Sequence, residues 1–133
     1  FLKKNNGICL FIDYGYSKGC GNTLQALKNH KYVDPLSFPG ESDLTSHINF
    51  SHVINEAENL GMNFFGPITQ RNFLINLGAR ERLEILKKSA NSEKIKNDLE
   101  EGLNRVIENS QMGELFKVCA ISPKNKLIPE GFD

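Results

Sequence analysis

Ile8-Cys9-Leu10-Phe11-Ile12-Asp13-Tyr14-Gly15 is a continuous apolar run that ends in an acid, an aromatic residue and a glycine. Such a run is typical of a buried strand in the middle of a sheet that is covered on both faces. The acid and the aromatic residue stand at its carboxyl end, where open α/β sheets bind their ligands. The segment therefore predicts an α/β fold with candidate site residues Asp13 and Tyr14.

A central strand of this kind needs parallel neighbours, which earlier βαβ units normally supply. Only seven residues precede Ile8, and the chain starts at Phe1 instead of Met. We therefore expect the chain to be the C-terminal part of a larger α/β protein whose first half is absent.

The charge balance and the hydropathy pattern exclude several classes of partner. The 133 residues include 16 Lys and Arg and 16 Asp and Glu, so the formal net charge is zero. A neutral chain with scattered basic residues has no electrostatic preference for nucleic acid or for an anionic membrane, and we expect neither as a partner. The longest apolar stretch is five residues, 8–12, whereas a membrane-spanning helix needs about 20.

Cysteine and histidine spacing predicts no metal site. The cysteines are an odd set without the close pairing of zinc ligands, and no histidine has a cysteine beside it. The residues concerned are Cys9, Cys20, Cys119, His30, His47 and His52. We expect free thiols, a reducing intracellular compartment, and surface or loop-anchoring roles for His30 and His47.

The region after the first strand has a mixed pattern. Thr23 is placed to cap a short helix that includes Leu24, Leu27 and His30. Residues 34–46 contain two prolines, a glycine and several acids and hydroxyls, so we expect an irregular, exposed loop there.

The remaining periodicities predict helices and strands in alternation. The expected elements are a helix from Ser51 to Gly61 capped by Asn49 or Ser51, a strand over 62–68, a helix from Thr69 to Gly78, a helix carrying Leu83 and Leu86, a helix from Ser92 to Ile107, and a strand over 115–121. Pro123 ends the last strand, and the final residues are expected to form a tail or an edge extension.

The segment Gly15 to Thr23 superficially resembles a phosphate-binding loop, because it is glycine-rich and follows a strand. A P-loop needs Gly-Lys followed directly by Ser or Thr. Here Lys18 precedes Gly19, and Gly21 is followed by Asn22. The order is wrong for a nucleoside triphosphate, so we expect the glycines to serve a flexible turn.

A longer string of residues is more specific than any one of these motifs. It comprises Asp13-Tyr14-Gly15, Thr23-Leu24, His30, Pro39-Gly40, Asp43-Leu44-Thr45, Asn49-Phe50, Ala57, Gly61, Phe65-Gly66, Thr69-Gln70, Phe73-Leu74, Leu77-Gly78, Met112-Gly113 and Phe116-Lys117-Val118. Together, over residues 7 to about 121, these resemble the MidA-like methyltransferase family. That family includes a mitochondrial complex I assembly factor that methylates a protein arginine.

The resemblance implies the Rossmann-like fold of class I S-adenosylmethionine-dependent methyltransferases. Residues 8–12 would be its fifth strand, residues 62–68 its sixth, and residues 115–121 an antiparallel seventh strand between them. Residues 1–121 would then be the C-terminal portion of the methyltransferase domain, with a helical insertion over about 69–113, and residues 122–133 a tail.

The resemblance also implies the cofactor S-adenosyl-L-methionine and a protein substrate. In such enzymes a glycine-rich turn after the first strand and an acid ending the second strand hold the cofactor. The main cofactor ligands are therefore expected upstream of Phe1, and no catalytic or cofactor-binding residue is assigned. We expect the chain to be inactive alone, to pair with the missing N-terminal half, and to act in the bacterial cytoplasm or the mitochondrial matrix.

Four residues are candidates for the substrate pocket. Asp13 is suited to pair with a guanidinium through two parallel hydrogen bonds, and Tyr14 to stack on the substrate or exclude solvent. Asp43 and Thr45 lie in a turn rich in acids and hydroxyls, 39–45, and are expected near the entrance for a cationic peptide. The structural alternative is that both acids cap their own loops and that Tyr14 packs at the rim.

A second hypothesis belongs to a different class. The chain is then a split-gene or degraded product that acts only as a binding or structural module. The open side of the first strand and the amphipathic helices would engage a partner. An open apolar edge should dimerise or aggregate, so sedimentation of the purified chain tests this point.

Overall fold

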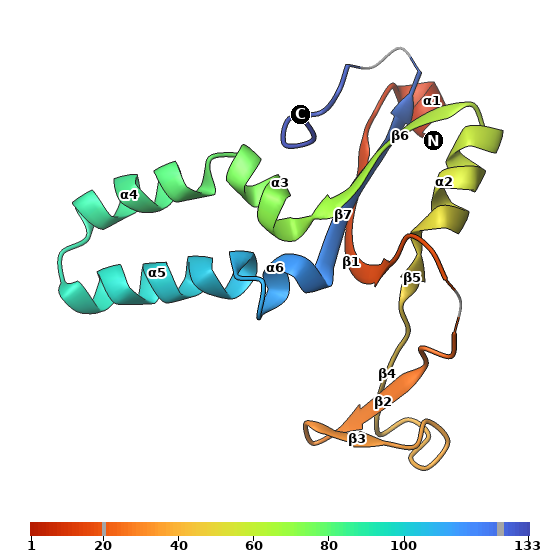
Figure 1. The fold of residues 1–133 in the computed structure, drawn as a ribbon, viewed down its shortest axis with the longest axis horizontal. Coiled ribbons are helices and arrows are strands. Elements are labelled where there is room, and N and C mark those ends of the chain that lie inside the picture. Colours follow the sequence, from red (N-terminus) through yellow and green to blue (C-terminus); the bar gives the residue numbers. More distant parts are fainter. Residues whose placement is uncertain (20, 125–126) are drawn as a thin grey trace.

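The protein is described by a computed structural model, which defines residues 1–19, 21–124 and 127–133. Its centre is a four-stranded sheet in the order β5 (Ile48–Asn49), β1 (Cys9–Tyr16), β7 (Phe116–Pro123) and β6 (Met62–Thr69) (Figure 1). Strand β7 is antiparallel to both β1 and β6. The last strand therefore lies between the other two, as expected, and the carboxyl ends of β1 and β6 reach the same end of the sheet.

Strand β7 forms the core of the sheet. Val118, Cys119, Ala120 and Ser122 are buried, because this strand has a hydrogen-bonded neighbour on each side. A strand flanked on both sides is apolar along most of its length. The apolar pattern of 115–121 thus predicted this strand correctly, with a start one residue later.

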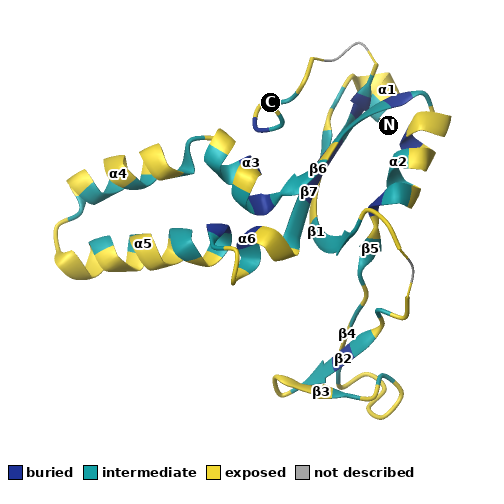
Figure 2. Ribbon diagram, viewed as in Figure 1, coloured by how far each residue is buried: buried dark blue, intermediate teal, exposed yellow. Residues whose placement is uncertain are grey.

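The apolar strand β1 is partly exposed in this chain, in keeping with the open side expected for it. Ile8, Leu10, Phe11 and Ile12 are 47, 48, 39 and 47% exposed. On the side away from β7, β1 pairs only at Gly15 and Tyr16, with the two-residue strand β5. No described strand pairs with the rest of that side, and Figure 2 shows β1 in the exposed and intermediate colours.

Helix α2 (Phe50–Asn59) packs against β6. Asn49 is its N-cap, since its side-chain oxygen accepts a hydrogen bond from the backbone N–H of His52. Phe50 and Ala57 are the buried residues of the helix, and the chain reverses after it at Gly61, whose φ is 64°. A short helix, α1 (Leu2–Asn5), precedes β1 and was not expected.

The expected helical region is a set of four helices that projects from the sheet. They are α3 (Gln70–Asn76), α4 (Ala79–Ser89), α5 (Glu93–Ile107) and the short α6 (Met112–Leu115). Thr69 and Ser92 cap α3 and α5 as predicted. Helices α4 and α5 run side by side as a hairpin that extends away from β6 and β7 (Figure 1).

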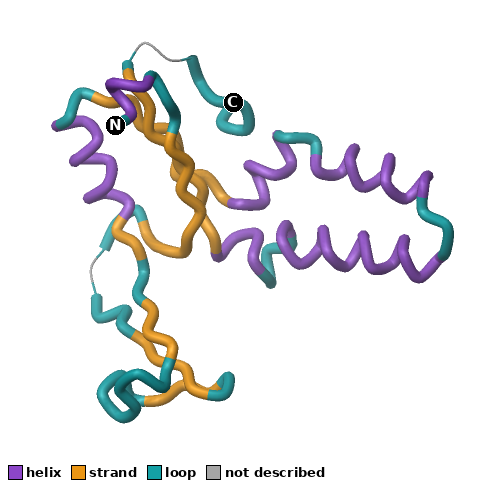
Figure 3. The backbone as a smooth tube through the Cα atoms, turned by 180° about the vertical axis from the view of Figure 1, so that it is seen from behind, coloured by secondary structure: helices purple, strands orange, loops and turns teal. Residues whose placement is uncertain are grey.

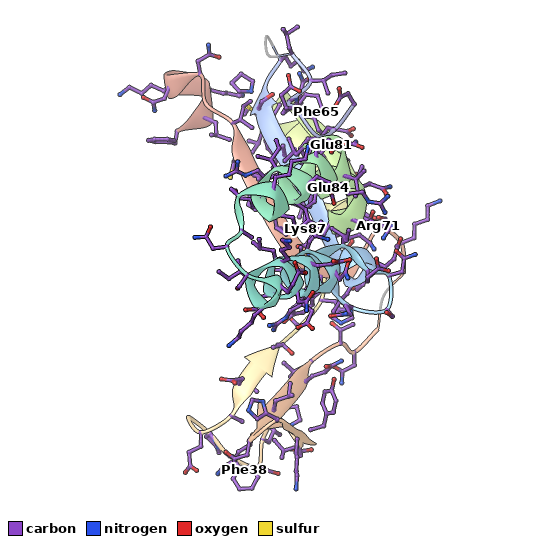
Figure 4. All side chains as sticks on the ribbon, turned by 90° about the vertical axis from the view of Figure 1, so that its left-hand side faces the viewer. Phe38, Phe65, Arg71, Glu81, Glu84 and Lys87 are labelled. Carbon is purple, nitrogen blue, oxygen red and sulfur yellow. The ribbon has the colours of Figure 1, made fainter. Side chains whose placement is uncertain are left out.

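The base of this hairpin is fixed by two side chains of α3. Gln70 donates a hydrogen bond of 2.9 Å to the carbonyl of Val106, and Arg71 one of 2.8 Å to the carbonyl of Ile107. These carbonyls end α5, where a cation is favourable because of the helix dipole. Figure 4 labels Arg71 of α3 together with Glu81, Glu84 and Lys87 of α4.

A second projection, which we call the arm, comprises residues 17–47. It contains a three-stranded sheet in the order β3 (Lys31–Val33), β2 (Gln25–Lys28) and β4 (Asp43–Thr45). The arm leaves the central sheet in a different direction from the helical hairpin (Figure 3).

The helix predicted from Thr23 to His30 is therefore wrong, as is the irregular structure over 43–45. Asn29 and His30 both have positive φ, 52° and 61°, which is the conformation of a two-residue type I′ hairpin turn. The turn and the long-range pairing of Ala26 with Val33 and Leu44 override the weak helical spacing. Lys28 closes the arm through a 2.6 Å ion pair with Glu41 and by lying 4.0 Å above the ring of Phe38.

The C-terminal residues 127–133 turn back onto α3. The ring of Phe132 lies 5.2 Å from that of Phe73 and 6.2 Å from that of Phe65. Asn76 donates hydrogen bonds to the carbonyls of Gly131 and Asp133 at 3.2 and 2.9 Å. This part of the expected tail is thus packed against the domain.

Candidate functional site

Asp13 and Tyr14 lie at the carboxyl end of β1, next to the carboxyl end of β6. The strand register aligns Asp13 with Lys117, and Lys117 with Thr69. Residues directly opposite each other in a sheet share one face. A row of three polar side chains therefore crosses the sheet on one face, while Tyr14 and its partner Phe116 lie on the other.

Asp13 is half-buried, and one of its carboxylate oxygens accepts a hydrogen bond of 2.8 Å from the backbone N–H of Tyr14. No ion pair of Asp13 is present among the described residues. Lys117, its cross-strand neighbour, directs its ammonium instead to the carbonyl and the carboxylate of Glu114. Asp13 thus keeps hydrogen-bonding capacity for a ligand at the strand end.

The ring of Tyr14 is held between two other aromatic rings. His47 and Phe116 each lie 5.5 Å from it, measured between ring centroids, with interplanar angles of 69° and 77°. Edge-to-face contacts at this separation are favourable, because the positive edge of one ring meets the negative face of another. We call these three residues the aromatic cluster. The sequence analysis did not predict the contacts of His47 and Phe116 with Tyr14, since neither lies near Tyr14 in the sequence.

The two ends of the arm meet beside this cluster. The backbone N–H of His47 donates a 3.1 Å hydrogen bond to the hydroxyl of Thr23, and the hydroxyl of Ser51 donates one to the carbonyl of Ser17. Gly15 faces Ile48 in the parallel β1–β5 pair. The segment of the arm that precedes β2 (the outgoing segment, with Ser17 and Thr23) is thereby joined to the segment that follows β4 (the returning segment, with His47). Both are joined to the end of β1.

Asp43 and Thr45 lie in β4 of the arm, where they pair across the sheet with Leu27 and Gln25. Asp43 is exposed and Thr45 is half-buried. No hydrogen bond or ion pair of the described residues joins either side chain to Asp13 or Tyr14. Thr45 is two residues before His47, so β4 is connected to the aromatic cluster through the chain itself.

The thiols of Cys9 and Cys119 are free, and Cys20 lies outside the described residues. Burial, with a smaller contribution from neighbouring Cys9, raises the pKa of Cys119 to about 11. This thiol stays protonated at neutral pH and is unsuited to nucleophilic or metal-binding roles. Within residues 1–19, 21–124 and 127–133, no group of three His, Cys, Asp or Glu side chains is arranged to hold a metal ion, and no described helix is long and apolar enough to cross a membrane.

The chain shares sequence with known methyltransferases. Residues 2–68 match the family described as "Putative S-adenosyl-L-methionine-dependent methyltransferase". The mitochondrial protein arginine methyltransferase NDUFAF7 of Xenopus tropicalis is 32% identical over 129 residues, which are 95% of this chain and 29% of that protein. The human protein of the same name is 32% identical over 91% of this chain and 27% of its own length. The Drosophila melanogaster homologue is 35% identical over 92% and 28%.

Two crystal structures of proteins from Burkholderia thailandensis have the same fold. One, of an uncharacterised protein, superimposes with a TM-score of 0.80 at 29% identity and covers 96% of this chain and 34% of that chain. The second, with S-adenosyl-homocysteine bound, gives a TM-score of 0.75 at 29% identity over 96% and 33%. The chain thus spans about a third or less of the length of these relatives.

Proposed function

Because the chain belongs to the S-adenosyl-L-methionine-dependent methyltransferase family that its residues 2–68 match, we propose that it supplies strands five to seven of an enzyme that methylates a protein arginine. The observation that carries this proposal is the strand order β1-β7-β6 with an antiparallel middle strand, which is the order expected at the end of such a sheet. Relatives named protein arginine methyltransferase support the substrate class. The matches confirm the resemblance to MidA-like methyltransferases.

The rest of the sheet would pair with the open side of β1. Within the part of the chain that the structure describes, no strand pairs with that side of β1 from Cys9 to Tyr14, and its apolar residues Leu10, Phe11 and Ile12 are exposed. The relatives are more than three times as long as the matched region, so they contain additional chain that can extend this sheet. We therefore propose the N-terminal half of such a polypeptide as the first partner of this chain.

Asp13 and Tyr14, at the carboxyl end of β1, are better suited to contact the substrate than to hold the cofactor. A cofactor of this kind is held by a glycine-rich turn that leads into a helix N-terminus. The glycine-rich segment after β1 leads instead into the arm, whose first element is the strand β2. The cofactor ligands are therefore assigned to the N-terminal half, and Asp13 and Tyr14 to the wall that faces the substrate.

Asp13 would bind and orient the substrate guanidinium. When bound, S-adenosyl-L-methionine supplies an electrophilic methyl group on its sulfonium. A carboxylate that pairs with one edge of the guanidinium aligns the reacting nitrogen, and correct alignment contributes much of the rate. Lys117 is paired with Glu114, so it leaves Asp13 available, and the Tyr14 ring would exclude water from the other face of the same strand end.

The arm would guide the substrate to this wall. Asp43 is an exposed acid on β4, and the chain runs from β4 directly to His47 at the end of β1. We propose that Asp43 and Thr45 line the entrance for a basic peptide. The methyltransferase portion would extend over residues 1–121 with its helical insertion at about 69–113, and the enzyme would act in a bacterial cytoplasm or in the mitochondrial matrix.

Substitution of Asp13 in the complete polypeptide tests the proposal. We expect Asp13→Asn to lower kcat/KM for an arginine peptide by about 100-fold, because the neutral amide loses the charge-assisted pairing. Binding of S-adenosyl-L-methionine, measured by calorimetry, should be unchanged. Asp98→Asn is the matched control, since Asp98 is an exposed acid on α5 with no ion pair among the described residues. Equal activity of both variants would contradict the role of Asp13.

The alternative function is a binding or structural module without catalysis. The exposed apolar residues of β1 are equally consistent with a non-catalytic binding module and with an enzyme that the N-terminal half completes. Co-expression with the N-terminal half of a bacterial relative separates the two. Methyl transfer by the reconstituted pair supports the enzyme, whereas a stable complex without transfer supports the module. The 133-residue chain alone should give no heat on titration with S-adenosyl-L-methionine, and tight binding would overturn this assignment of the cofactor ligands.

A further inference from the structure

The aromatic cluster joins three parts of the molecule that are far apart in the sequence. Tyr14 comes from the end of β1, His47 from the returning segment of the arm, and Phe116 from the start of β7, directly after α6. Both neighbouring rings meet Tyr14 edge to face at 5.5 Å. The orientation of the Tyr14 ring therefore depends on where the arm and the helical region are anchored.

His47 is the member that fixes the arm. Its backbone N–H donates to Thr23 on the outgoing segment at 3.1 Å, while its ring contacts Tyr14. The next residue, Ile48, is paired with Gly15. One residue thus joins both segments of the arm to the strand that carries Asp13.

We propose that His47 is a positioning residue of the substrate site, which holds the Tyr14 ring and the arm in one arrangement at the carboxyl end of β1. The expected effect of His47 on catalysis rests on the proposed function. The expected effect of His47 on the stability of the arm rests only on the contacts described above. His47 acts through its ring and its backbone N–H, so another aromatic residue at this position should preserve both contacts.

The structural consequence is measured by hydrogen exchange in the complete polypeptide. We expect His47→Ala to accelerate exchange of the amides of Gly15, Tyr16 and Ile48 about fivefold, because the ring contact that stabilises the arm is lost. His47→Phe should restore the slower rates. His52→Ala is the control, since this histidine is an exposed residue of α2 outside the aromatic cluster. It should leave the exchange rates of all three amides unchanged. Unchanged exchange in His47→Ala would overturn the proposal.

The catalytic consequence is measured with S-adenosyl-L-methionine and a synthetic peptide with one arginine flanked by glycines. We expect His47→Ala to lower kcat/KM for the peptide about tenfold and to leave KM for S-adenosyl-L-methionine unchanged, with recovery in His47→Phe. Equal losses in His47→Phe and His47→Ala would overturn positioning by the ring. If the unsubstituted enzyme methylates no arginine, the proposed function fails, while the exchange experiment still decides the role of His47.

Discussion

Gly15 of β1 lies close to the backbone of Ile48, the residue of β5 that directly follows the arm. A Cβ atom at this position would lie 2.9 Å from a ring carbon of Phe50 and closer still to the carbonyl oxygen of Ile48. Phe50 is almost completely buried, so it has little room to move. The glycine of the Asp13-Tyr14-Gly15 motif is therefore required by packing, independently of any role in catalysis.

We expect Gly15→Ala to lower the free energy of unfolding by about 2–4 kcal/mol, because the added methyl group must displace backbone rather than a flexible side chain. Gly102→Ala is the matched control. Nothing lies within 4 Å of a Cβ at Gly102, which is in the middle of the exposed face of α5. That substitution should stabilise the protein by about 1 kcal/mol through helix propensity. Urea denaturation measures both, and a neutral Gly15→Ala would contradict the packing argument.

Cys119 gives a prediction about pH. Burial first and Cys9 second raise the pKa of this thiol to about 11 from its ordinary value of 9.0. The folded state thus retains a proton that the unfolded chain loses, so this contribution to stability is complete below pH 9 and disappears as the pH rises to about 11.

Between these limits the protein should lose about 2–3 kcal/mol of unfolding free energy through this group. The readout is the difference between the unsubstituted protein and Cys119→Ala in urea denaturation at several pH values, because this difference isolates the contribution of the thiol. We expect the stability curve of Cys119→Ala to fall less steeply above pH 9. Parallel curves would show that the thiol is not shielded from solvent.

At the scale of elements, the arm is a small sheet stabilised by its turn and by few contacts. A three-stranded sheet with little buried apolar surface is only marginally stable. Ala26 is completely buried, but Leu44, which pairs with it, is 60% exposed. The Asn29-His30 turn and the Lys28–Glu41 pair directly before it therefore contribute more to the stability of the arm than such features contribute to the central sheet.

His30 has a φ of 61°, which glycine adopts without cost and alanine does not. We expect His30→Gly to stabilise the β2–β3 hairpin by about 1 kcal/mol and His30→Ala to leave it no more stable than the natural sequence. Hydrogen exchange over 25–33 measures this effect without reference to global unfolding. Faster exchange in His30→Gly than in His30→Ala would show that the turn is not type I′.

At the scale of the whole molecule, one side of strand β1 is exposed, although its residues are apolar like those of a buried strand. Four apolar residues of the segment 8–12 are exposed, and most of the outer edge of β1 has no backbone partner among the described residues. Open apolar edges pair with other chains. The family relatives contain enough additional chain to cover this edge.

We therefore expect the 133-residue chain alone to self-associate with increasing concentration in sedimentation velocity experiments. Leu10→Lys combined with Ile12→Lys should reduce this association, because both changes place charge on the open strand. Leu36→Lys is the control, since Leu36 is 84% exposed but belongs to the arm. A monomer at all concentrations, or an equal effect of the control, would contradict the role of β1.

The sequence by itself determined the elements that depend on local pattern. Strands β1, β6 and β7 and the caps Asn49, Thr69 and Ser92 follow from apolar runs and from side chains that reach backbone groups within three residues. The position of Asp13 and Tyr14 at a strand end follows in the same way. The resemblance added the order of the strands, which the structure confirms.

Only the tertiary structure decided which distant residues meet. It turned 25–28 into a strand because Val33 and Leu44 pair with Ala26, and it placed His47 and Phe116 around Tyr14. It also left β1 exposed, although its composition is that of a buried strand. The physical reason is the same in each case: burial and pairing depend on contacts between segments far apart in the chain, which local periodicity does not encode.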